Sequence, residues 1–120
     1  MRTDAIAEIL ADLNSSSGDI EASAVVSLDG LMMASLLPNN VEEDRVAAMS
    51  AALLALGERT AKELDRGGLN QILIQGSDGY VVMTEAGTEA VLTVLTKKEA
   101  KLGLVFLDVS RTAKELERIL

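Results

Sequence analysis

The sequence predicts an α/β fold, a three-layer α-β-α sandwich around a five-stranded antiparallel sheet, with elements in the order α-β-β-α-β-β-β-α. Three observations predict it. Short strand-like segments are joined by turns that contain Gly and Asp, which favour antiparallel neighbours. Several of these segments are apolar at consecutive positions, as is typical of a sheet covered on both faces. Segments of helical periodicity lie at the start, middle and end of the 120-residue chain, where they can supply the cover. We expect one domain over residues 1–120.

The first half of the chain begins with a short helix and a hairpin. Apolar residues at helical spacing predict the helix over residues 3–13. Strands are expected at Ile20–Ser27 and Leu31–Leu36, separated by Asp29-Gly30. An Asp-Gly pair supplies the positive φ angles of a tight hairpin, so we interpret it as a corner and not as a catalytic site. Met32 and Met33 should then point to opposite faces of the sheet.

A long helix is predicted next, over residues 42–66. Asn40 and Glu43 resemble a capping box at its start, and Gly67-Gly68 is expected to end it. One stripe of this helix is expected to pack on the sheet, namely Val46, Met49, Leu53, Leu56, Thr60 and Leu64.

The remaining faces of this helix carry no charge between Val46 and Gly57. A helix that is apolar nearly all round is buried nearly all round, and a second subunit is the expected cover. Alanines chosen only for helix propensity are the alternative explanation. The residues expected at such a subunit interface are Ala47, Ala48, Ala51, Ala52, Leu54 and Ala55.

The second half of the chain predicts strands at Gln71–Gln75, Tyr80–Glu85 and Ala90–Thr96, followed by a helix over Ala100–Leu120. The last helix could begin as early as Lys97, because Thr96 and Glu99 also fit a capping box.

The composition excludes several functions. The chain has neither Cys nor His, so disulfides, Cys-based sites and imidazole chemistry cannot occur. The formal net charge of −8 disfavours nucleic acid as a partner. No apolar stretch approaches the ~20 residues of a membrane span. Charged residues interrupt the N-terminal segment, so it does not resemble the apolar region of a signal peptide. We therefore expect a cytoplasmic protein that is not an enzyme and has no cofactor, no metal and no membrane span.

Three stretches, in this order, resemble the Roadblock/dynein light chain family. They are Ala24–Leu31 (AVVSLDGL), Gly79–Thr84 (GYVVMT) and Leu102–Leu107 (LGLVFL). The resemblance covers nearly the whole chain and implies a dimer in which the long middle helices pack together. It also implies that the third strands pair across the dimer, which adds Gln71, Ile72, Leu73, Ile74 and Gln75 to the expected interface.

The resemblance further implies a function. Prokaryotic members of the family commonly regulate small Ras-like GTPases, among them a GTPase of cell polarity and gliding motility. We therefore expect a homodimeric GTPase-activating or GTPase-binding protein, with Arg45, Glu58, Arg59 and Lys62 as candidate partner-binding residues. A dimeric adaptor of another complex, without nucleotide dependence, is the alternative, and a small-ligand sensor or enzyme built on this sandwich is a third reading.

Overall fold

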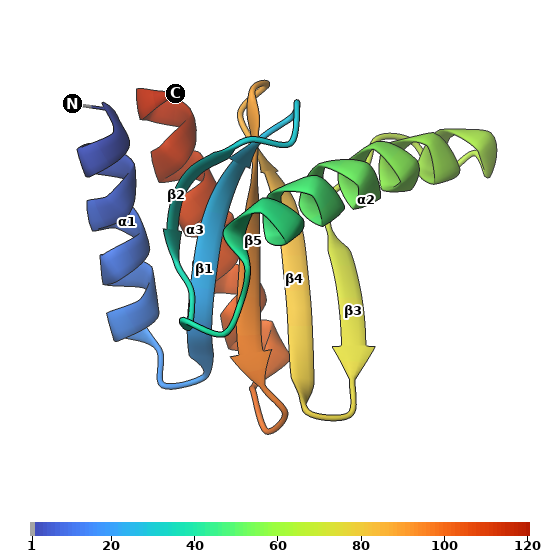
Figure 1. Ribbon diagram of the computed structural model, residues 1–120. Helices are drawn as coiled ribbons and strands as arrows, with labels where there is room; N and C mark the ends of the chain where they lie inside the picture. Colours follow the sequence, from blue (N-terminus) through green and yellow to red (C-terminus); the bar gives the residue numbers. More distant parts are fainter. Residues whose placement is uncertain (1) are drawn as a thin grey trace.

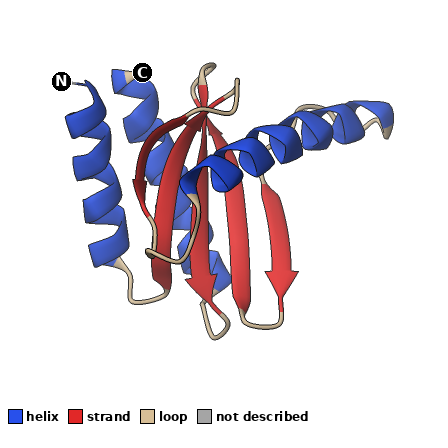
Figure 2. Cartoon of the chain, viewed as in Figure 1, coloured by secondary structure: helices blue, strands red, loops and turns tan. Residues whose placement is uncertain are grey.

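The computed structural model describes residues 2–120 and shows a five-stranded antiparallel sheet between helices (Figure 1; Figure 2). The strand order is β2-β1-β5-β4-β3, which leaves β2 and β3 at the edges. The predicted fold class and element order are confirmed. The elements are α1 (Arg2–Ser16), β1 (Ile20–Ser27), β2 (Met32–Leu36), α2 (Glu43–Glu63), β3 (Ile72–Gly76), β4 (Gly79–Ala86), β5 (Ala90–Lys97) and α3 (Leu102–Ile119).

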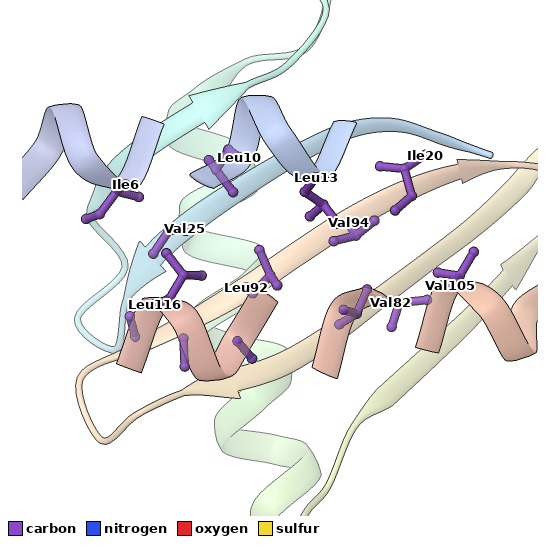
Figure 3. Close-up of a cluster of buried hydrophobic side chains, with 14 residues drawn as sticks. Ile6, Leu10, Leu13, Ile20, Val25, Val82, Leu92, Val94, Val105 and Leu116 are labelled. Carbon is purple, nitrogen blue, oxygen red and sulfur yellow. The ribbon is translucent and has the colours of Figure 1, made fainter. Parts of the chain in front are cut away.

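The back face of the sheet, as we name it, is covered by α1 and α3 and holds the larger core. Figure 3 shows side chains of both helices meeting over the strands. Burial of each large aliphatic side chain contributes roughly 1.5–3 kcal/mol, so this layer dominates the stability of the chain. Its buried members include Ile6, Leu10, Leu13, Val25, Leu92, Val94, Val105, Val109 and Leu116.

The front face is crossed by α2, which leaves part of the sheet uncovered and extends past β3 (Figure 1). The helix meets the sheet through small residues. Ala47 and Ser50 are buried there, and a Cβ built on Gly57 would lie 2.8 Å from Ile72 Cδ1. The stripe expected to pack on the sheet is therefore partly wrong: Met49, Leu56 and Leu64 are 57%, 61% and 64% exposed. Leu54 is the large side chain of α2 that is buried against the sheet, and the small residues on either side of it let the helix approach the strands closely.

The chain turns between β1 and β2 at Asp29-Gly30 as predicted, but of the two residues only Gly30 has a positive φ. Gly30 has a φ of +87°, and its N–H donates to the carbonyl of Ser27 at 3.0 Å. Met32 packs against the front cluster and Met33 against the back cluster. The prediction that the two methionines face opposite ways is confirmed.

The ends of α2 differ from the prediction. Glu42 is the N-cap and makes no side-chain capping bond, so the Asn40–Glu43 capping box is wrong. The Glu43 carboxylate instead accepts a 2.6 Å hydrogen bond from the Ser35 hydroxyl. The helix ends before the two glycines, because Asp65 adopts a φ of +56° and the Arg66 N–H donates to the Ala61 carbonyl at 2.8 Å.

The start of α3 also differs. Thr96 lies in β5 and its hydroxyl donates to the Lys97 carbonyl, so it forms no capping box with Glu99. The Lys101 N–H donates to Asp19 Oδ2 at 2.9 Å, and Lys97 Nζ lies 3.3 Å from the same carboxylate. These contacts, the Lys101 N–H foremost, lower the pKa of Asp19.

A buried hydrogen bond ties α2 to the middle of the sheet. Thr93 Oγ1 on β5 donates to Ser50 Oγ at 2.9 Å, and both residues are buried. A buried hydroxyl without its partner costs about 1–3 kcal/mol. We expect Ser50→Ala to lower the free energy of unfolding by that amount, measured by urea denaturation at fixed protein concentration.

The matched control for this prediction is Ser77→Ala, since Ser77 is exposed in the β3–β4 turn and should change stability very little. The double variant Ser50→Ala with Thr93→Val removes both hydroxyls, so it should cost less than the sum of the single changes. Additive costs would contradict the assigned bond.

Candidate interaction surface on helix α2 and strand β3

An apolar trough runs along one flank of α2. It consists of two grooves, of about 460 Å³ and about 240 Å³. The larger groove lies between the second half of α2 and β3, where Leu69 and Ile72 form its other wall. The smaller groove lies over the uncovered part of the sheet, at Ile74, Val81 and Leu95. We name the helix side of this trough the leucine flank, defined as Met49, Leu53, Leu56 and Leu64.

Strand β3 borders this trough and is an edge strand of the sheet. Its outer side has no neighbour among the described strands, and Leu73 and Ile74 are exposed. The strand carries no charged residue, proline or bulge that would discourage pairing with another chain. An apolar edge of this kind is a template for another strand.

A second apolar surface lies on the outer side and opposite flank of α2. We name it the alanine surface, defined as Ala48, Ala51, Ala52, Ala55 and Leu31. Ala48 and Ala51 lie beside Gly30 of the hairpin, and Leu31 is largely exposed next to them.

The structure corrects two residues of the expected subunit interface. Ala47 and Leu54 are 1% and 2% exposed, because they pack against the chain's own sheet. Neither side chain is available to a partner. The other alanines of the expected set remain partly or fully exposed.

The candidate partner-binding residues lie on α2, but only some of them lie together. Glu58, Arg59 and Lys62 line one shallow depression on the outer side of the helix. Arg45 lies near the start of α2, about 20 Å away along the helix axis. Arg45 pairs with Glu42 at 3.3 Å and Arg59 with Glu63 at 3.2 Å, so both cations are engaged by near neighbours in the sequence.

Glu58 also faces the sheet. It is half-buried and shares a hydrogen bond with the carboxyl of Glu85 on β4. This hydrogen bond, together with partial burial and the Glu58 charge, raises the pKa of Glu85 to about 6. Above that pH, the Glu85 side chain is a carboxylate that lies beside Glu58, where α2 crosses β4.

The raised pKa of Glu85 predicts a pH-dependent stability. The folded chain holds this proton more tightly than the unfolded chain, so the contribution is fully present below about pH 4.5 and is lost as the pH rises through about 6. Glu85 is largely exposed, which limits the effect to about 0.5 kcal/mol. We expect Glu85→Gln to raise the melting temperature at pH 8 and to leave it unchanged at pH 4, measured by circular dichroism.

The control for the pH prediction is Glu21→Gln, an exposed glutamate on β1. It should give no difference between the two pH values. An equal effect of Glu85→Gln at pH 4 and pH 8 would contradict the assigned carboxyl pair.

Residues 2–120 hold no group of three or more His, Cys, Asp or Glu side chains placed to bind a metal. Within the same residues, no helix is both long and apolar enough to cross a membrane. What the surface offers is contact area on α2 and β3.

Sequence reasoning missed the leucine flank as a surface, because it assigned these residues to the chain's own core. A usable signal was present. Small residues recur along α2 at Ala47, Ser50, Gly57 and Ala61, and this spacing marks the face that approaches the sheet closely.

Comparisons with known proteins agree with this architecture. The sequence model of the Roadblock/LC7 domain family matches residues 6–96. The uncharacterized protein MJ1340 of Methanocaldococcus jannaschii is 40% identical over 112 residues, which cover 93% of this chain and 96% of that protein.

Solved structures show the same fold. "MglB with tetrameric arrangement" superposes with a TM-score of 0.88 at 24% identity, covering 98% of this chain and 89% of that one. The gliding protein MglB from Thermus thermophilus gives 0.87 at 24% identity, covering 98% and 90%. With the family match over most of its length, the chain belongs to the Roadblock/LC7 domain family.

Proposed function

We propose that this chain is a homodimeric, non-catalytic regulator or scaffold for a small Ras-like GTPase. The observation that carries the dimer is the trough beside α2, since its leucine flank and the β3 edge form one continuous apolar surface. Family membership supports the GTPase, because the resemblance implies this class of partner.

The proposed dimer follows from the geometry of β3. When an edge strand pairs antiparallel with its own symmetry copy, the two-fold axis is perpendicular to the sheet. Both α2 helices then lie on the same face of one continuous sheet. Since α2 extends past β3, its second half reaches over the uncovered sheet of the other subunit (Figure 1).

In this arrangement the leucine flanks of the two helices meet over β3. Each newly buried leucine or methionine contributes on the order of 1–2 kcal/mol at its present exposure, and the paired strands add main-chain hydrogen bonds. The expected interface therefore shifts from the alanines to Met49, Leu53, Leu56 and Leu64, with β3 retained.

The alanine surface stays outward in such a dimer and is the proposed contact for the GTPase. Small side chains let another protein approach the helix backbone closely. Arg59 and Lys62 in the adjacent depression supply cations at the rim, where charges guide the rate and specificity of association.

The dimer predicts an effect of Leu56→Glu. A carboxylate placed in the apolar contact would be buried without a partner, so the dimer dissociation constant should rise about a hundredfold or more. Sedimentation equilibrium measures this change against the chain mass of 12.7 kDa. The control is Leu28→Glu at the hairpin, an exposed leucine outside the trough, which should leave the mass unchanged. A monomeric wild-type chain at all concentrations would overturn the dimer.

If the partner is a small GTPase, its capture by this chain should depend on the bound nucleotide. The immobilised chain is mixed with native cell lysate supplied with either GDP or a non-hydrolysable GTP analogue. We expect a Ras-like GTPase to be retained only with the analogue. The double variant Ala52→Glu with Arg59→Glu, which leaves the leucine flank intact, should lose the GTPase and keep the dimer mass.

Other outcomes of the capture experiment favour the alternative. Retention of the same partners in both nucleotide states, with no GTPase among them, would contradict the proposed GTPase-regulator function and support a dimeric adaptor. Where a GTPase is captured, single-turnover hydrolysis with and without the chain separates an activator from a scaffold.

A further inference from the structure

Among the described residues, the outer side of the back layer carries two unpaired acids on α1 and two unpaired bases on α3. Glu8 and Asp12 are exposed on α1, and Lys114 and Arg118 are exposed on α3. Within residues 2–120 none of these four side chains forms an ion pair or hydrogen bond. On the same side of α3, Arg111 is engaged by Asp108 at 2.8 Å, and Glu117 lies at the edge beside Gly87.

The charges on the two helices lie at matching levels. The groove between the helices is lined by Asp12 and Ser16 of α1 and by Arg111 and Glu115 of α3, which places Asp12 level with this part of α3. The helices run in opposite directions, since the two chain termini lie at the same end (Figure 1). Glu8 lies one helical turn before Asp12, and Arg118 lies one helical turn after Lys114. Both are therefore about 6 Å closer to the end that holds the chain termini.

We propose that a second copy of this chain docks against the back layer, so that α1 of each copy lies against α3 of the other. A two-fold axis parallel to the helices, midway between them, keeps every residue at its level. It places Glu8 opposite Arg118 of the second copy and Asp12 opposite Lys114 of the second copy. An axis perpendicular to the helices would instead place acids against acids and bases against bases.

Exposed leucines supply an apolar part of the same contact. Leu104 and Leu107 are 56% and 63% exposed on the first turns of α3. The start of α3 is displaced sideways from the end of α1, so these turns lie beside the groove between the two helices (Figure 1). In the two-fold arrangement they add apolar area to be buried at the margin of the contact.

A second copy fits this face better than other occupants. An anionic lipid surface would attract α3 but be repelled by α1 and by the net charge of −8. An acidic peptide would pair with α3 and leave α1 unmatched. Only a surface with both signs at the same spacing matches the whole face, and this chain carries that surface itself. The contact does not depend on the dimer proposed through α2 and β3.

Charge-swap variants test the proposal. The first variant carries Glu8→Lys with Asp12→Lys, and the second carries Lys114→Glu with Arg118→Glu. Either variant alone faces like charges across the contact, so each should lose the larger species that the wild type forms in sedimentation at about 50 mM salt. An equimolar mixture restores opposite charges at every contact and should regain that species, which also shows that both variants are folded.

The control variant, Arg45→Glu with Lys62→Glu, changes the net charge as the second variant does but lies on α2, so it should keep the larger species. The first variant also makes the net charge less negative, and stronger self-association by it alone would show that general repulsion governs assembly and would overturn the proposal. No larger species in the wild type at low salt, or no recovery on mixing, would overturn it too.

The experiment also separates this contact from the α2 dimer. Leu56→Glu should reduce the mass of the species found at high salt, because it disrupts the α2 dimer. The mass of this variant should still double when the salt concentration is lowered. If the α2 dimer is absent, the wild type still doubles from the monomer mass at low salt. Loss of the doubling with a preserved high-salt dimer would overturn the back-face contact alone.

Discussion

The unequal cover of the two sheet faces is the constraint on which the rest of this structure depends. Within the described chain, α1 and α3 share the back face, whereas α2 alone crosses the front. One helix cannot cover five strands, so part of the front face, at Ile74, Val81 and Leu95, stays accessible. The leucine flank of α2 borders this area on one side, and the edge strand β3 borders it on another. The apolar surface is thus a consequence of the topology and not of scattered exposed residues.

The sequence could predict the elements because each has a local signature. Periodicity identified the helices, and the Asp29-Gly30 turn together with Met32 and Met33 identified a hairpin inside a doubly covered sheet. It could not predict the orientation of α2. A helical wheel tells which residues share a face but not which face meets the sheet, and α2 is apolar on several faces. The close approach of α2 to the sheet determines this orientation, since the contact between Gly57 and Ile72 leaves no room for a larger side chain at position 57.

Contacts between segments far apart in the sequence were also out of reach. The backbone N–H of Lys101, the N-cap of α3, is bound by Asp19, which is 82 residues away in the chain, and a search for local capping boxes points to Thr96 and Glu99 instead. The same limit applies to the candidate site. Glu58, Arg59 and Lys62 lie together because they occupy adjacent helical turns, whereas the pairing of Glu58 with Glu85 requires the fold.

The two layers differ in how their charges are compensated. On α2, Arg45 and Arg59 are paired with near neighbours in the sequence, so the front surface offers mainly apolar contact. On the outer side of the back layer, the acids Glu8 and Asp12 lie on α1 and the bases Lys114 and Arg118 on α3, all four unpaired within residues 2–120. Salt screens exposed charges over about 8–10 Å but hardly weakens apolar burial. We therefore expect salt to weaken the proposed back-layer contact more than the proposed apolar α2 dimer, so that one contact can be lost while the other is kept.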